Sequence, residues 1–138
     1  MWWIYALLSA FFASLTAIFA KVGVENVNSN LATAIRTVVV LVMIWLIVFW
    51  KDEVKGITEL SRRTWFFLTI SGIATGLSWI FYFKALQMGE VSKVAGIDKL
   101  SLALTIIFAV IFLGETLTWK TAAGAVLIIA GTLFLIWK

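Results

Sequence analysis

The sequence predicts an all-α integral membrane protein, a bundle of five transmembrane helices. Hydrophobic residues make up 63% of its 138 residues and charged residues only 13%, whereas a soluble domain carries roughly 45–50% and about 25%. The apolar residues form five blocks of 17 to 21 residues, and a helix needs about 20 to cross the hydrocarbon core. The period-two alternation of a membrane β-barrel is absent from these blocks.

The first span is expected at residues 2–20, which contain no charged residue. A secretory signal is the alternative, but this stretch lacks the basic n-region that such a signal requires and is long for its apolar part. Trp2 and Trp3 suit an anchor at the membrane interface. We therefore expect a retained first helix.

The other four spans contain three charges in total. They are expected at residues 31–50, 64–83, 94–114 and 121–137. Arg36 is the one charged residue of the second span, and adjacent Asp98 and Lys99 are the charged residues of the fourth. The connections, of six to 13 residues, leave no room for a soluble domain. The sequence thus predicts a single membrane domain over residues 2–137.

The distribution of lysine and arginine predicts how the chain is oriented, because cytoplasmic loops are enriched in both. The side with the N-terminus carries Lys51, Lys55, Arg62, Arg63 and Lys120. The opposite side carries Lys21, Lys84, Lys93 and Lys138, with Arg36 and Lys99 just inside the membrane. The four basic residues of the second connection favour a cytoplasmic N-terminus and an exported C-terminus. Because the two totals are similar, insertion in both orientations stays open.

Arg36 and Asp98 are expected roughly 6–9 Å below the same membrane surface, because their helices run in the same direction. An ionised group at the centre of a membrane helix costs about 2.5–3.5 kcal/mol, so such groups turn inward, pair, or line a wet cavity. A guanidinium can hold a carboxylate through two hydrogen bonds. One interpretation is therefore a structural clasp between the second and fourth helices. The other is a polar vestibule that handles a solute or proton.

Hydroxyl-bearing stripes extend inward from the charged end. On the third helix the stripe is Ser71, Thr75, Ser78 and Tyr82; on the fourth it is Asp98, Ser101 and Thr105; on the second it is Asn30, Thr33 and Thr37. Each spacing of three or four residues keeps a stripe on one helical face. A single stripe is explained by hydrogen bonds between helices. Three stripes that converge are better explained by a hydrated pathway.

The candidate pathway is built from these residues. It comprises Arg36, Thr37, Ser78, Trp79, Tyr82, Asp98, Lys99, Ser101 and Thr105, with Lys21 and Lys84 as charges of the vestibule. Trp79 lies inside the third helix and either lines a pocket or faces lipid. Gly96 loosens the helix start by roughly 1 kcal/mol relative to alanine. It serves either a local unwinding that binds a solute or close packing against a neighbouring helix.

Four segments resemble one family. "NLATAIRT" (30–37), "YFKALQMGEVSKVAGIDKLS" (82–101), "FLGE" (112–115) and "GAVLIIAGTLFLI" (124–136) are similar to an EamA domain of the drug/metabolite transporter superfamily. The resemblance implies one EamA-type repeat and a secondary transporter that exports amino acids, metabolites or xenobiotics across the plasma membrane. Glycine stands at 96, where many relatives carry proline.

Family members commonly carry two such repeats in tandem, inverted relative to one another, whereas this chain has one. Because five spans are an odd number, two copies can form an inverted pair only by inserting in opposite directions. We therefore expect an antiparallel homodimer. A parallel homodimer, a heterodimer with a related half-transporter and a monomer are the alternatives.

Other function classes are weighed against a solute transporter. A lipid-flipping subunit and a purely structural subunit remain alternatives, whereas an enzyme is disfavoured because the chain has no histidine or cysteine and no paired carboxylates in one predicted pocket. The absence of a glycine-rich phosphate loop disfavours transport driven by ATP. We expect no cofactor, no metal and no nucleic acid partner; the partners expected are a small-molecule substrate and membrane lipid.

Overall fold

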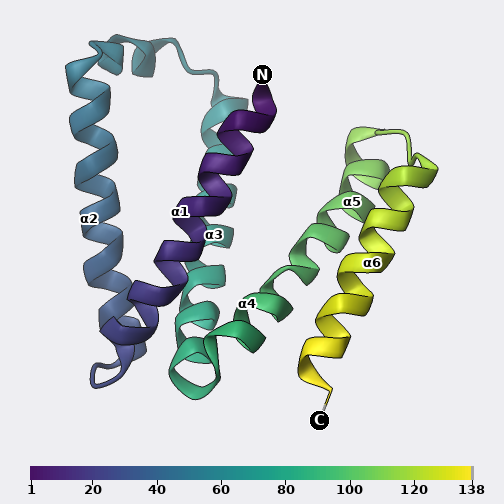
Figure 1. Cartoon of the computed structure of the whole chain (residues 1–138). Coiled ribbons are helices and arrows are strands. Elements are labelled where there is room, and N and C mark those ends of the chain that lie inside the picture. The colour runs from purple at the N-terminus through teal and green to yellow at the C-terminus, as the bar shows by residue number, and fades with distance from the viewer. Residues whose placement is uncertain (138) are drawn as a thin grey trace. The chain divides into compact units, whose positions relative to one another are not determined.

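The computed structural model describes residues 1–137, and every regular element in that range is helical (Figure 1). The elements are α1 (Trp2–Val24), α2 (Ser29–Trp50), the 3-10 helix η1 (Glu53–Glu59), α3 (Arg62–Met88), α4 (Val91–Asp98), α5 (Leu100–Leu113) and α6 (Trp119–Ile136). Within the described range, five segments are long and apolar enough to cross a membrane, the fourth being Val91–Leu113. The predicted all-α membrane class is confirmed.

Local signals in the sequence set the helix ends. The Asn28 side chain accepts a hydrogen bond from the Asn30 backbone N–H at 2.9 Å and so caps α2. α5 ends at Gly114, whose φ of +67° is left-handed, and the Glu115 N–H returns to the Ala109 carbonyl at 3.2 Å. Glycine suits this left-handed stop because it has no Cβ to clash.

Two helices continue past the predicted membrane boundary. The first was expected at 2–20 and ends at Val24; the third was expected at 64–83 and ends at Met88. Charge marks where an apolar block stops, but a helix stops only where its backbone finds a cap or a breaker. The chain has no proline to impose one.

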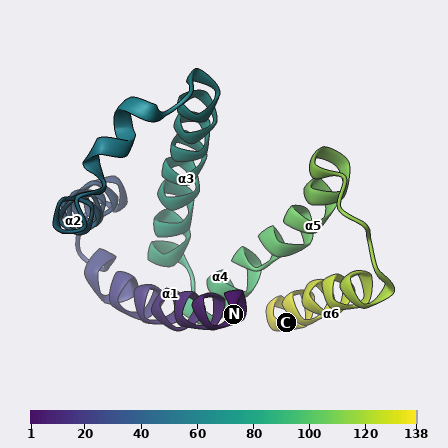
Figure 2. The same ribbon diagram turned by 90° about the horizontal axis from the view of Figure 1, so that it is seen from above.

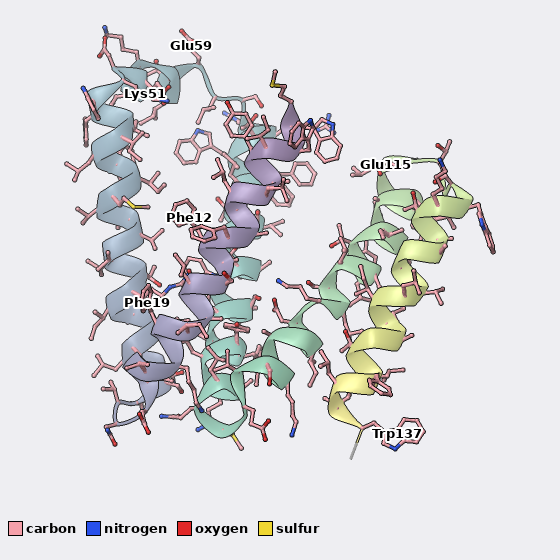
Figure 3. The ribbon with its side chains drawn as sticks, in the orientation of Figure 1. Phe12, Phe19, Lys51, Glu59, Glu115 and Trp137 are labelled. Atoms are coloured by element: carbon pink, nitrogen blue, oxygen red, sulfur yellow. The ribbon has the colours of Figure 1, made fainter. Side chains whose placement is uncertain are left out.

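The chain divides into two compact units, and each is described by itself. The central unit is Ala20–Gln87, and the terminal unit consists of Met1–Phe19 with the chain from Met88 onward. In the central unit, η1 links the end of α2 to the start of α3, as Figure 2 shows from above. Lys51 and Glu59 mark this connection in Figure 3.

Side chains tie together the other end of the central unit. The Lys21 ammonium donates to the Leu86 carbonyl at 2.7 Å. The Gln87 amide donates to the carbonyls of Val24 and Val27 at 3.1 and 2.8 Å. Beneath these bonds the side chains of Val24 and Leu86 are fully buried. The α1–α2 connection is therefore fastened to the C-terminal end of α3.

In the terminal unit, α4 and α5 both pack against α6. In Figure 3, Glu115 marks the connection between α5 and α6, and Trp137 marks the residue after the end of α6. The fourth span, expected as one helix over 94–114, is interrupted at Lys99. There the Lys99 N–H bonds the Gly96 carbonyl at 3.1 Å and the Leu102 N–H bonds the Lys99 carbonyl at 3.0 Å, both across three residues instead of four.

Gly96 lies against α6. A Cβ built on it would come within 2.8 Å of Leu135 Cδ1, so this glycine allows a close approach of two helices. The Thr132 hydroxyl of α6 donates to the Gly96 carbonyl at 3.0 Å. Close packing at Gly96, one of the two predicted alternatives, is thus observed, and the interruption of the helix follows three residues later.

Thr132→Val should lower the free energy of unfolding by about 1 kcal/mol, because it removes an interhelical hydrogen bond of a side chain that is buried in the protein. Unfolding of the purified protein in mixed micelles measures the change. Thr69→Val is the matched control, since that exposed hydroxyl donates only to the Trp65 carbonyl of its own helix. Equal losses in the two variants would contradict a role for the α4–α6 bond.

Candidate functional site

Arg36 lies on the aromatic rings of α3. Its guanidinium carbon is 4.5 Å from the ring centroid of Trp79 and 5.3 Å from that of Phe83. These two rings are four residues apart on one helix, so they share a face. Arg36 follows the start of α2 by seven residues, which is about 10 Å along the helix axis. The structure therefore joins two predicted pathway residues, Arg36 and Trp79, and adds Phe83.

Sequence reasoning missed Phe83. The signal was available, because Phe83 lies one turn after Trp79, but apolar residues on a predicted span were assigned to lipid or packing. Its side chain is only 2% exposed, which makes it part of the core of the central unit. Trp79 is half-buried, with one face of its ring toward Arg36. Whether it also lines a pocket or faces lipid stays a prediction.

Asp98 and Lys99 stand at the interruption between α4 and α5. Their side chains form an ion pair with 3.6 Å between Lys99 Nζ and Asp98 Oδ2, and the Asp98 side chain is 39% exposed. A half-exposed pair between neighbouring residues contributes about 0–1 kcal/mol. Asp98 belongs to the terminal unit and Arg36 to the central unit. Their pairing, whether as clasp or vestibule, stays a prediction.

The threonines of the predicted stripes bond to their own helices. The hydroxyls of Thr37, Thr75 and Thr105 donate to the carbonyl four residues earlier, at 2.8 to 2.9 Å. Each oxygen keeps its capacity to accept a hydrogen bond from another group. The stripes of α2 and α3 lie in the central unit and that of α5 in the terminal unit. Their convergence on one pathway stays a prediction.

The remaining predicted residues are distributed as follows. Tyr82 is half-buried, whereas Ser78, Lys84 and Ser101 are exposed. Lys21 was predicted as a vestibule charge, and its ammonium donates to the last turn of α3, where cations favour a helix C-terminus. It thus has a structural contact as well as its charge.

A pocket of about 240 Å³ lies between α5 and α6, beside their connection. Its polar lining includes Thr105, Glu115 and Thr121. Thr105 is a predicted pathway residue, whereas Glu115 entered only through the "FLGE" segment. No group of three or more His, Cys, Asp or Glu side chains able to hold a metal occurs among residues 1–137.

Five apolar helices that carry a few charged and hydroxyl-bearing side chains at depth define a multi-pass membrane protein. The chain belongs to the EamA-like transporter family, whose sequence profile matches residues 1–137. It is accordingly a membrane transporter of the drug/metabolite type, as the resemblance implied.

Curated relatives agree with the family. The chain is 51% identical over 134 residues to an uncharacterized transporter from the cobO 3' region of Sinorhizobium sp., covering 97% of this chain and 95% of that one. It is 30% identical to the uncharacterized transporter YvbV of Bacillus subtilis, covering 90% of this chain but 41% of that one. An uncharacterized protein of Methanocaldococcus jannaschii is 30% identical and is covered over 93% of its length. No solved structure matches the chain.

Proposed function

We propose that the protein is a secondary transporter that exports small metabolites, amino acids or xenobiotics across the plasma membrane, as a dimer of five-helix subunits. The observation that carries the proposal is membership of the EamA-like transporter family over residues 1–137. Arg36 and Asp98 support it, since charges within membrane spans are costly unless they serve a function or are compensated. No phosphate-binding loop is present to couple transport to ATP.

The dimer is supported by the lengths of the relatives. Two of them are covered over more than nine-tenths of their length, so they too are about the size of one five-helix unit. YvbV is covered over only 41%, so it has room for two such units. A dimer of this chain would contain two five-helix units, the number for which the longer YvbV chain has room. A heterodimer with a related half-transporter is the alternative.

An antiparallel arrangement is the one that makes two identical five-span subunits an inverted pair. This arrangement requires that the chain insert in both orientations. The similar numbers of lysine and arginine expected on the two sides of the membrane support such insertion. The four basic residues between α2 and α3 favour copies with the N-terminus in the cytoplasm and the C-terminus outside. The inverted copies supply the other half of each dimer.

Transport by the purified protein in liposomes tests the function. We expect flux of a small solute through the wild type and loss of that flux in Arg36→Ala. Scrambling of labelled lipid without solute flux would overturn the solute assignment in favour of a lipid-handling subunit. Inactivity in both assays, for protein shown to be folded and inserted, would point to a structural role.

A further inference from the structure

Within the central unit, the closest contacts of the Arg36 guanidinium are with aromatic rings. The faces of Trp79 and Phe83 attract the guanidinium charge. Ring faces do not accept the in-plane N–H groups, and an arginine presents five of them. Among the described residues of the central unit, Arg36 has no carboxylate ion-pair partner, and the Tyr82 side chain is the other group that acts on its charge. The rings orient the guanidinium and leave its hydrogen-bonding edge to another group.

The carboxylates of the central unit do not supply that group. Asp52 pairs with Lys55 at 2.6 Å, beyond the far end of α2. Glu53 and Glu59 bound η1, which also follows α2. Glu25 lies in the α1–α2 connection and is exposed. Three of the four acidic residues of this unit are thus at the opposite end of α2 from Arg36.

The charge around Arg36 is positive. Lys21 fastens α1 to the last turn of α3, and Lys84 follows Phe83 directly on α3 with its side chain exposed. Two lysines and one arginine therefore stand at this end of the unit against Glu25 alone. A surface of one sign in a low-dielectric setting draws ligands of the opposite sign.

We propose that Arg36, held on Trp79 and Phe83, binds the oxyanion of an organic ligand, a carboxylate or a phosphate, and that the transported solute is therefore anionic. A planar guanidinium matches both groups through two parallel N–H···O bonds, which a lysine cannot form. The half-buried Trp79 ring lies beside the charge, and we extend the proposal to a ligand with an apolar body next to its oxyanion. That the ligand is the transported solute rests on the proposed function. That the ligand is anionic rests on the contacts of Arg36.

Binding to the detergent-purified full chain tests the proposal independently of transport. Benzoate and phenyl phosphate are the anionic probes; benzamide and benzylamine are the neutral and cationic probes of the same shape. Thermal unfolding reports binding, because a ligand of the folded state raises the apparent stability. We expect stabilisation by the two anions alone, with affinity about tenfold weaker in Arg36→Gln and partly restored in Arg36→Lys.

Arg63→Gln is the matched control, since the Arg63 guanidinium carbon lies 5.8 Å from the ring centroid of Phe67 on the same helix but outside the candidate site. It should bind the anions like the wild type. Equal stabilisation of wild type and Arg36→Gln by the anions, or equal stabilisation of the wild type by benzylamine, would overturn the proposal. Where Arg36→Gln does not fold, Trp79→Leu, which keeps the charge and removes one ring, should weaken anion binding, and unchanged binding would overturn it.

A lipid arm separates the two sources of an oxyanion. Nanodiscs of phosphatidylglycerol are compared with nanodiscs of phosphatidylcholine. Stabilisation by phosphatidylglycerol that depends on Arg36, with no response to the free anions, retains the oxyanion site but overturns the solute assignment. If the protein binds anions through Arg36 but moves no solute, the oxyanion site is supported and the proposed transport function is contradicted. If it transports cations and binds no anion, the transport function is supported and the oxyanion site is contradicted.

Discussion

Asp98→Asn is expected to reduce solute flux in liposomes by about tenfold or more, equal to about 1.4 kcal/mol or more of lost interaction. The substitution keeps the size of the side chain and removes its charge at the interruption between α4 and α5. Stability should change little, because the partner of Asp98 is the adjacent, largely exposed Lys99. Initial rates in liposomes, with unfolding of the same preparation, separate the two effects.

Glu90→Gln is the control for this prediction. Glu90 also pairs with a lysine, Lys93, at 3.0 Å, and it stands directly before the same helix, outside the candidate pathway. It should keep the flux of the wild type. A similar fall in both variants would assign the loss to the packing of α4, and unchanged flux in Asp98→Asn would remove Asp98 from the pathway.

Variants locked in one orientation are expected to be inactive alone and active together. Replacing Lys51, Lys55, Arg62 and Arg63 by glutamine leaves Lys120 as the one basic residue on the side of the N-terminus, against four on the other side. This variant should insert with its N-terminus outside. Adding charge with Glu53→Lys and Glu59→Lys should fix the N-terminus in the cytoplasm. Neither protein can form an antiparallel pair with itself.

Co-expression of the two variants supplies both orientations and should restore transport. Labelling of single cysteines introduced at the ends of the chain measures the orientation of each variant, and flux in cells measures activity. Two copies of the same variant carried on separate plasmids control for the amount of protein. Full activity of either variant alone would rule out the antiparallel homodimer.

The sequence predicted the five spans because the length of an apolar block and the scarcity of charge follow from the thickness of the bilayer. It did not place the interruption at Lys99. Helical periodicity continues through residues 94–114, and the short backbone bonds occur where Gly96 meets Leu135 and Thr132 of α6. A contact between segments about 36 residues apart leaves no mark in a local pattern.

The sequence singled out residues of the candidate site but not the contacts that they make. Charge within an apolar block singled out Arg36, and a position inside the third span singled out Trp79. The aromatic surface under Arg36 was not foreseen, because pairing was assigned to the opposite charge of Asp98 and Phe83 looked like any apolar residue of a span. The threonines were recognised by spacing, but their donors serve the backbone four residues earlier. These contacts depend on the direction in which each side chain points, which residue spacing along the sequence does not specify.

The bonds from Lys21 and Gln87 have a consequence for how a transport cycle can proceed. They join the last turn of α1, the entry of α2 and the exit of α3, so we expect these three parts to move together in the proposed transport cycle. Arg36 and Trp79 lie one to three turns from this fastening and travel with it. In the proposed cycle, a ligand held there is expected to change the compartment it faces by rocking of the whole block, with its binding geometry kept.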